Sequence, residues 1–143
     1  MANKGNILVG TVGQGVMLSA DEGESWSRAS VRSGMHSDCI VRALREDARH
    51  PEVVYAGTDV GLYRSDDRGM KWRLLDNPMK GSVVWSVAID PNDSAVMFAG
   101  TGTPSKPGTF RSTDGGKSWA PLGVAIADDC PNVGIPRPTG IAV

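Results

Sequence analysis

Side chains able to bind ions or exchange protons stand in the segments between the apolar runs of this 143-residue sequence. The candidate set is His36, Asp38, Arg42, Trp85, Lys106, Asp128, Asp129 and Arg137. Histidine and aspartate can hold a metal ion by ligand type. The spacing of His36, Asp38 and Asp128 is not diagnostic of such a site, so we expect neither a metal nor another cofactor. A further carboxylate, Asp59, directly follows the apolar run VVYAGT.

The elements that must position these residues carry a motif that occurs three times. Each copy reads Ser-x-Asp-x-Gly-x-x-Trp, as SADEGESW (19–26), SDDRGMKW (65–72) and STDGGKSW (112–119). The three tryptophans are separated by 46 and then 47 residues. A fixed period of this size indicates repeated supersecondary units.

Short apolar segments recur around each copy of the motif. In the second unit they are 41–47, 53–58, 61–66 and 71–76, and all are too short for helices. They are rich in Val, Ile, Tyr, Phe and Trp and are separated by Gly, Pro, Asp or Asn, which is typical of strands and turns. The sequence therefore predicts an all-β fold of three four-stranded antiparallel units.

The repeated motif resembles the Asp-box, or BNR, repeat of β-propellers, as found in sialidases, sortilin-type receptors and several glycoside hydrolases. The resemblance implies blades in which each Asp box forms the hairpin turn between the third and fourth strands. The aspartate can accept hydrogen bonds from turn N–H groups, the glycine permits an unusual backbone angle, and the tryptophan returns to pack between sheets. We therefore expect structural roles, with all three tryptophans buried, for Asp21, Gly23, Trp26, Asp67, Gly69, Trp72, Asp114, Gly116 and Trp119.

The two ends of the chain leave the count of blades incomplete. The blade units are 6–38, 39–83 and 84–138, and residues 139–143 align with the first strand of a further blade. Three blades are fewer than the four to eight of closed propellers, and an open arc would expose apolar blade faces. The pattern favours an N-terminal part, or half, of a longer propeller, and a homo-oligomer is the alternative. Residues 139–143 are expected to pair beside ILVGT (7–11) or to continue into further sequence.

Antiparallel alternation predicts which loops share an end of the blades. The turns that hold the Asp boxes lie at one end, called the bottom here. The loops that depart from the repeat, 34–39, 101–108 and 124–139, lie at the other end, the top. Because a rigid scaffold positions functional loops, we expect the eight candidate residues to converge on the top rim near the central channel.

Several functions are open to such a scaffold, because one propeller fold hosts many chemistries. A sialidase would need an arginine triad and a tyrosine nucleophile, but Tyr55 and Tyr63 lie in strand segments. The stretch GTDVGLYRSDD resembles glycoside hydrolases that cleave xyloglucan, and the resemblance implies that Asp59 would be one of two catalytic carboxylates. Its partner is not visible in the sequence. We therefore favour a binding or scaffold module whose top rim takes a carbohydrate, peptide or protein, with a glycoside hydrolase-like enzyme as the alternative.

Composition argues against other classes. Fifteen basic and sixteen acidic residues give a net charge of −1, which does not indicate binding to nucleic acid or to an anionic membrane. The first fifteen residues, MANKGNILVGTVGQG, lack the apolar core of a signal peptide. The two cysteines, Cys39 and Cys130, are too few for a disulfide framework. We expect a cytoplasmic protein, or a secreted one if a leader has been removed.

Overall fold

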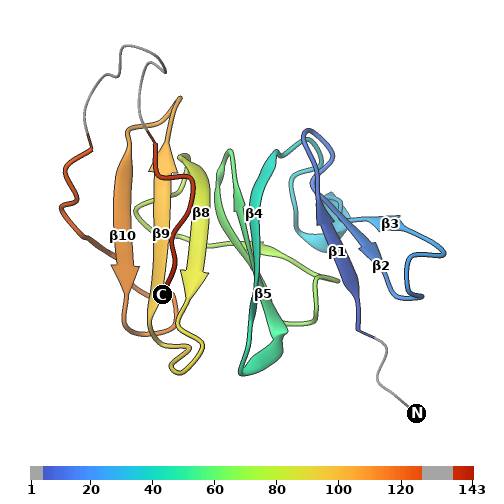
Figure 1. Cartoon of the computed structure of the whole chain (residues 1–143). Coiled ribbons are helices and arrows are strands. Elements are labelled where there is room, and N and C mark those ends of the chain that lie inside the picture. The colour runs from blue at the N-terminus through green and yellow to red at the C-terminus, as the bar shows by residue number, and fades with distance from the viewer. Residues whose placement is uncertain (1–4, 127–136) are drawn as a thin grey trace.

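The computed structural model describes residues 5–126 and 137–143 of the chain. Apart from one short 3₁₀ helix, η1 (Val31–Ser33), the regular elements of these residues are β-strands. The strands form three antiparallel sheets that stand side by side, in chain order, across the molecule (Figure 1). The all-β prediction, with three Asp-box units, is therefore confirmed.

The first sheet contains three strands rather than four. It is made of β1 (Ile7–Gly10), β2 (Val16–Ser19) and β3 (Ser27–Arg28), in that order. The strand that begins each of the other two sheets has no counterpart here among the described residues. The first unit therefore starts at its second strand, as the repeat alignment predicts, and no strand of the described residues completes it.

The second and third sheets each contain four strands that follow one another in the chain. The second sheet consists of β4 (Val41–Asp47), β5 (His50–Thr58), β6 (Gly61–Ser65) and β7 (Arg73–Leu74). The third sheet consists of β8 (Val83–Ile89), β9 (Met97–Gly102), β10 (Gly108–Ser112) and β11 (Ala120–Pro121). In the second sheet these bounds agree with the predicted segments, except that β5 begins earlier, at His50, and β7 is shorter than 71–76.

The second sheet is buried on both of its faces. Strand β5 shows this directly, because successive side chains of a strand point to opposite faces. Val54 and Ala56 belong to the apolar cluster shared with the first sheet. Val53 and Tyr55 belong to the cluster shared with the third sheet. The hydrophobic core of the molecule therefore consists of two layers, one on each side of the second sheet.

The three Asp boxes form nearly identical turns at the bottom of the sheets. In each copy the serine hydroxyl donates to the aspartate Oδ1 at 2.8 to 2.9 Å and accepts the glycine N–H at 2.8 to 2.9 Å. The same Oδ1 accepts the N–H four residues further on at 2.7 to 2.9 Å. The indole N–H donates to the glycine carbonyl at 2.9 to 3.1 Å. The side chains of each Asp box are therefore hydrogen-bonded within their own turn. The serine hydroxyl bridges the aspartate and the glycine, a role that the sequence did not suggest.

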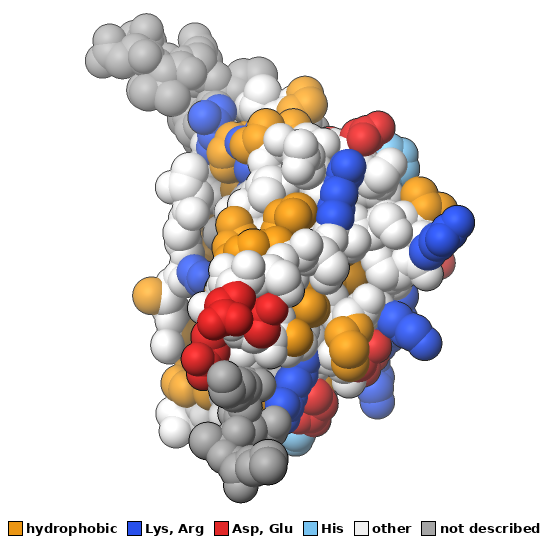
Figure 2. Space-filling model, turned by 90° about the vertical axis from the view of Figure 1, so that its right-hand side faces the viewer, with side chains coloured by type: hydrophobic (Ala, Val, Ile, Leu, Met, Phe, Trp, Pro, Cys, Tyr) orange, Lys and Arg blue, Asp and Glu red, His pale blue; other side chains and the backbone are white. Residues whose placement is uncertain are grey.

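Two of the three Asp-box tryptophans are buried between sheets. The exposed fraction is 5% for Trp72, which packs against the first sheet, and 8% for Trp119, which packs against the second. Trp26 is 43% exposed, so the expectation of three buried tryptophans is wrong for the first unit. Each of the two buried indoles is covered by the preceding sheet, and the described residues contain no sheet before the first. Figure 2 looks onto this side of the molecule, where Ile7, Val9 and Trp26 are among the exposed hydrophobic residues.

The last seven residues, 137–143, lie along the outer side of the third sheet (Figure 1). They form no strand in this chain. Ser86 on β8 donates its hydroxyl to the carbonyl of Pro138 at 3.3 Å. Pairing of residues 139–143 beside β1 within the chain, one of the expected arrangements, therefore does not occur.

Candidate functional site

Arg42 and Trp85 stand at equivalent places near the start of the first strands of the second and third sheets. In both sheets the pairing register shifts at this residue, between Val41 and Ala43 on β4 and between Val84 and Ser86 on β8. A β-bulge redirects a side chain out of the regular alternation of a strand. The two bulges therefore release Arg42 and Trp85 from the sheet while the preceding valines stay in the core.

Arg137 reaches the same place from the far end of the sequence. Residues 137 and 138 cross the face of the third sheet that points away from the second sheet. Gly100 and Gly102 on β9 allow this approach, because a Cβ atom on either would collide with Pro138 or Arg137. Glycine is used where another stretch of chain comes this close.

These three residues form a stack around one aromatic ring, the Arg–Trp–Arg stack (Arg42, Trp85 and Arg137). The guanidinium carbon of Arg42 lies 4.3 Å from the centroid of the Trp85 ring, and that of Arg137 lies 4.2 Å from it. The two arginines come from distant segments of the chain, and both contact the same ring. The indole N–H donates to the carbonyl of Thr103 at 3.3 Å. Each cation–π contact at such an exposed site stabilises the arrangement by about 0.5–1 kcal/mol.

Both guanidinium groups of the stack are accessible to solvent. Arg42 and Arg137 are exposed, and Trp85 is half-buried. Neither arginine forms an ion pair with a carboxylate of residues 5–126 or 137–143. Arginine stays charged at any physiological pH, and its planar fork suits carboxylate and phosphate groups. The stack can therefore hold two positive charges in place and present them to an anionic or hydrogen-bond-accepting ligand.

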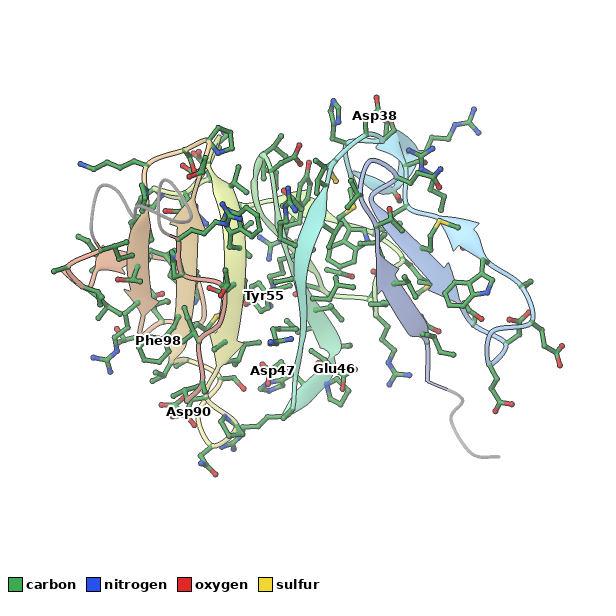
Figure 3. The ribbon with its side chains drawn as sticks, turned by 45° about the horizontal axis from the view of Figure 1, so that its top comes forward. Asp38, Glu46, Asp47, Tyr55, Asp90 and Phe98 are labelled. Carbon is green, nitrogen blue, oxygen red and sulfur yellow. The ribbon has the colours of Figure 1, made fainter. Side chains whose placement is uncertain are left out.

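His36 and Asp38 lie at the top as well, but they form a separate pair. Asp38 receives an ion-pair contact from Arg28 at 3.7 Å, and its N–H lies 3.4 Å from His36 Nδ1. The N–H of His36 lies 3.4 Å from the Tyr63 hydroxyl oxygen. Figure 3 shows Asp38 at the end of the molecule opposite to Asp47 and Asp90. No contact in the described structure joins this pair to the Arg–Trp–Arg stack.

Lys106, the other rim candidate among the described residues, has no contact with the stack that would make it a fourth member. Lys106 is exposed on the loop between β9 and β10, where its carbonyl accepts the Thr101 hydroxyl at 3.0 Å. Asp128 and Asp129 lie outside the described residues. The structure therefore brings together three of the eight candidates, and it separates the histidine–aspartate pair from them.

Asp59, the carboxylate implied by the hydrolase resemblance, lies on the loop between β5 and β6. Its Oδ1 accepts the N–H of Ile40 at 2.8 Å, and its own N–H donates to the carbonyl of Ile40 at 3.1 Å. One carboxylate oxygen is thus used to fasten the connection that enters β4. Burial of the neighbouring Cys39 thiol raises its pKa to about 11, and the negative charge of Asp59 is the second cause of this rise.

The aspartates of the Asp boxes serve the turns and do not gather at one site. The Ser25 hydroxyl, followed by the Ser25 N–H, lowers the pKa of Asp21 to about 2. The Ser118 hydroxyl and N–H act in the same way on Asp114, whose pKa is also about 2. A carboxyl group held ionised by its own turn is suited to closing the turn and is a poor proton donor near neutral pH.

A cleft of about 470 Å³ at the bottom, between the second and third sheets, was not anticipated from the sequence. Asp47 is buried there, and its Oδ1 accepts the Ser94 hydroxyl of the next sheet at 2.6 Å. Arg64 donates to the Tyr55 hydroxyl at 2.8 Å, and that hydroxyl donates to the carbonyl of Gly115 at 3.2 Å. Figure 3 shows Tyr55 and Asp47 between the two sheets. These polar groups are paired across the two blades, so we assign them to blade docking. The sequence contains one signal for this polar contact: Asp47 and Asp90 end the equivalent segments VRALRED (41–47) and VWSVAID (84–90).

Two further findings concern the described part of the chain. Residues 5–126 and 137–143 contain no group of three or more His, Cys, Asp or Glu side chains placed to hold a metal ion. Within the same ranges, no helix has the length and apolar character needed to cross a membrane.

Comparison with known proteins agrees with this geometry. A model of the BNR/Asp-box repeat matches residues 110–121. The xyloglucanase Xgh74A of Acetivibrio thermocellus is 25% identical over 130 residues, which cover 73% of this chain and 15% of that enzyme. The chain thus spans less than a fifth of the length of this curated relative.

Solved structures show the same fold. The crystal structure of an ancestral GH74 enzyme is similar with a TM-score of 0.67 and 23% identity, over 85% of this chain and 17% of that one. The GH74 xyloglucanase from Xanthomonas campestris is similar with a TM-score of 0.63 and 24% identity, over 87% of this chain and 19% of that one. The chain therefore contains a match to the BNR/Asp-box repeat and has the fold of the GH74 β-propeller enzymes.

Proposed function

We propose that this chain supplies a carbohydrate-binding face of a β-propeller, with the Arg–Trp–Arg stack at its centre. The observation that carries the proposal is the meeting of Arg42, Trp85 and Arg137 at the top. Two of them leave their strands at bulges and the third returns from the end of the sequence. None of the three is needed to close a turn or fill the core, so packing alone does not account for their convergence.

The relatives support a carbohydrate as the class of ligand. Two of the proteins that this chain resembles are named as xyloglucanases. In a propeller the ligand site lies on loops that the rigid blades hold in place. The Asp boxes, which occupy the opposite end, hold their side chains in internal hydrogen bonds and leave the top free to vary.

The test is a titration of the 143-residue chain with a panel of neutral and acidic plant cell-wall oligosaccharides, followed by calorimetry. We expect Arg42→Ala and Arg137→Ala each to weaken binding about tenfold while the melting temperature changes little, since both side chains are exposed. Arg45→Ala is the matched control, because Arg45 is an exposed arginine further along the same strand. Absence of binding to the whole panel, or binding that both stack variants leave unchanged, would refute the proposal.

A second candidate function is hydrolysis of a glycosidic bond, and the placement of Asp59 favours it. Asp59 lies at the top, in the stretch that resembles the xyloglucan-cleaving enzymes, and Oδ2 has no hydrogen bond to the described residues. A hydrolase needs a second carboxylate, which we propose is supplied from outside the described residues.

The release of reducing ends from xyloglucan tests this candidate. Asp59→Asn keeps an oxygen that can accept the Ile40 N–H but removes the charge, whereas Asp59→Ala removes both. Loss of turnover in Asp59→Asn with an unchanged melting temperature would support catalysis. Equal turnover in the parent and in Asp59→Asn would assign Asp59 to loop structure alone.

A further inference from the structure

We infer that the Arg–Trp–Arg stack selects an acidic oligosaccharide, one that carries uronic-acid carboxylates, over a neutral one. This inference rests on the proposed function, because it names the class of carbohydrate that the same rim would take. It comes from what already occupies the aromatic ring and from the charge that surrounds it.

The indole of Trp85 already has two guanidinium groups in contact with its ring. A neutral sugar gains most from an aromatic side chain by stacking on an open face of its ring. Guanidinium groups lie 4.3 Å and 4.2 Å from the ring centroid, and the ring N–H is engaged by Thr103. A neutral sugar that stacks on a face covered by a guanidinium group would have to displace that arginine, and the displacement would cost a cation–π contact.

The charge at the stack, in contrast, favours an anion. The two guanidinium carbons are at most twice 4.3 Å, about 8.6 Å, apart, because both lie within 4.3 Å of one centroid. Two like charges at this distance repel one another in any solvent of modest ionic strength. A carboxylate beside them relieves the repulsion and receives charge-assisted hydrogen bonds from planar, preorganised forks.

The two aspartates described at the same end, Asp38 and Asp59, do not cancel this charge. Asp38 is in ion-pair contact with Arg28, and Asp59 holds the N–H of Ile40. Each of these carboxylates has its own local partner, and neither is in ion-pair contact with Arg42 or Arg137. The positive charge of the stack is therefore available to a ligand.

The experiment compares two probes that differ only at C6 of each sugar, β-1,4-linked tetraglucuronate with carboxylates and cellotetraose with hydroxymethyl groups, titrated into the 143-residue chain. We expect the acidic probe to bind at least tenfold more tightly in 50 mM salt. Arg42→Gln and Arg137→Gln should each reduce its affinity about tenfold, while Arg45→Gln should leave it unchanged. Hexaglutamate serves as a control for charge without sugar and should bind more weakly than tetraglucuronate.

The outcomes distinguish a failure of the acidic selectivity from a failure of carbohydrate binding itself. Equal binding of the two tetrasaccharides, both weakened by the stack variants, would overturn the acidic selectivity and leave carbohydrate binding intact. Binding of hexaglutamate as tight as that of tetraglucuronate would overturn the choice of a sugar and indicate an acidic peptide. Absence of binding to either tetrasaccharide would overturn the inference, and absence of binding to the wider panel as well would refute the proposed function.

Discussion

Replacement of each Asp-box tryptophan by alanine should separate the contribution of the turn from that of blade packing. The three tryptophans occupy the same local motif and make the same hydrogen bond to a glycine carbonyl. They differ in burial, since Trp72 and Trp119 are covered by a neighbouring sheet and Trp26 is 43% exposed. The comparison therefore varies the packing while the local hydrogen bonding stays constant.

The magnitudes follow from this difference. Alanine in place of a buried tryptophan costs about 3–5 kcal/mol, and we expect Trp72→Ala to fall in this range. The same change at Trp26 removes less buried area and leaves no closed cavity, so we expect about 1–2 kcal/mol. The lost indole hydrogen bond contributes about 0.5–1.5 kcal/mol to both values and cancels in the difference. The difference between the two variants should therefore be about 1–4 kcal/mol.

The assay is urea unfolding followed by far-UV circular dichroism, because each variant removes one of the four tryptophans and so changes the fluorescence signal itself. If Trp72→Ala fails to fold, Trp72→Phe provides a milder change that still loses the indole N–H. Equal free-energy losses for Trp26→Ala and Trp72→Ala, in dilute monomeric protein, would refute the assignment of Trp72 to blade packing. They would mean that the turn alone determines the effect.

The remaining predictions concern charge, backbone, thiol chemistry and assembly. The folded pKa of about 2 for Asp21 and Asp114 lies below the unfolded value near 4, so the stability they contribute is present above pH 4 and is lost as the pH falls toward 2. Urea midpoints from pH 7 to pH 2 should fall less steeply over that window in Asp114→Asn than in the parent. Gly34 has a φ of 86° and no room for a Cβ atom beside the Trp72 carbonyl, so Gly34→Ala should cost more than about 1 kcal/mol and lower the melting temperature by several degrees. Cys39 is buried and the pKa of its thiol is raised to about 11, so a thiol reagent at pH 8 should label it only in urea; rapid labelling of the folded chain would contradict its burial. The exposed apolar face of the first sheet should make the chain self-associate in light scattering, and a monomer at every concentration would contradict this.

The fold was predictable from the sequence because the Asp box is a local structure. Its hydrogen bonds connect residues no more than four positions apart, so the order Ser-x-Asp-x-Gly-x-x-Trp contains all the information that the turn needs. The period of the motif then gives the length of the units, and the apolar segments give their strands. Trp26 shows the limit of this reasoning, because its burial depends on a sheet that the motif does not contain.

The candidate site was predictable only in part, because its contacts join distant positions. The repeat alignment predicted that Arg42 and Trp85 occupy equivalent positions in their strands, as the structure shows. It could not predict how far from them His36 lies around the top of the blades. The approach of Arg137 depends on how the last residues cross the third sheet, which no repeat specifies. The cross-blade bond between Asp47 and Ser94 was missed for the same reason, since it joins residues 47 positions apart.

The two ends of the blades differ in how freely their residues can change. At the bottom, each Asp-box side chain is bonded within its own turn or packed under a neighbouring sheet, so a substitution there alters stability directly. At the top, Arg42, Trp85 and Arg137 contact one another across separate segments, and the two arginines are exposed. A substitution in the stack changes the charge offered to a ligand while the turns that hold the blades together remain intact. Since the bulges that present Arg42 and Trp85 are features of the backbone, the same scaffold can exchange one set of rim side chains for another and so change its ligand without rebuilding its core.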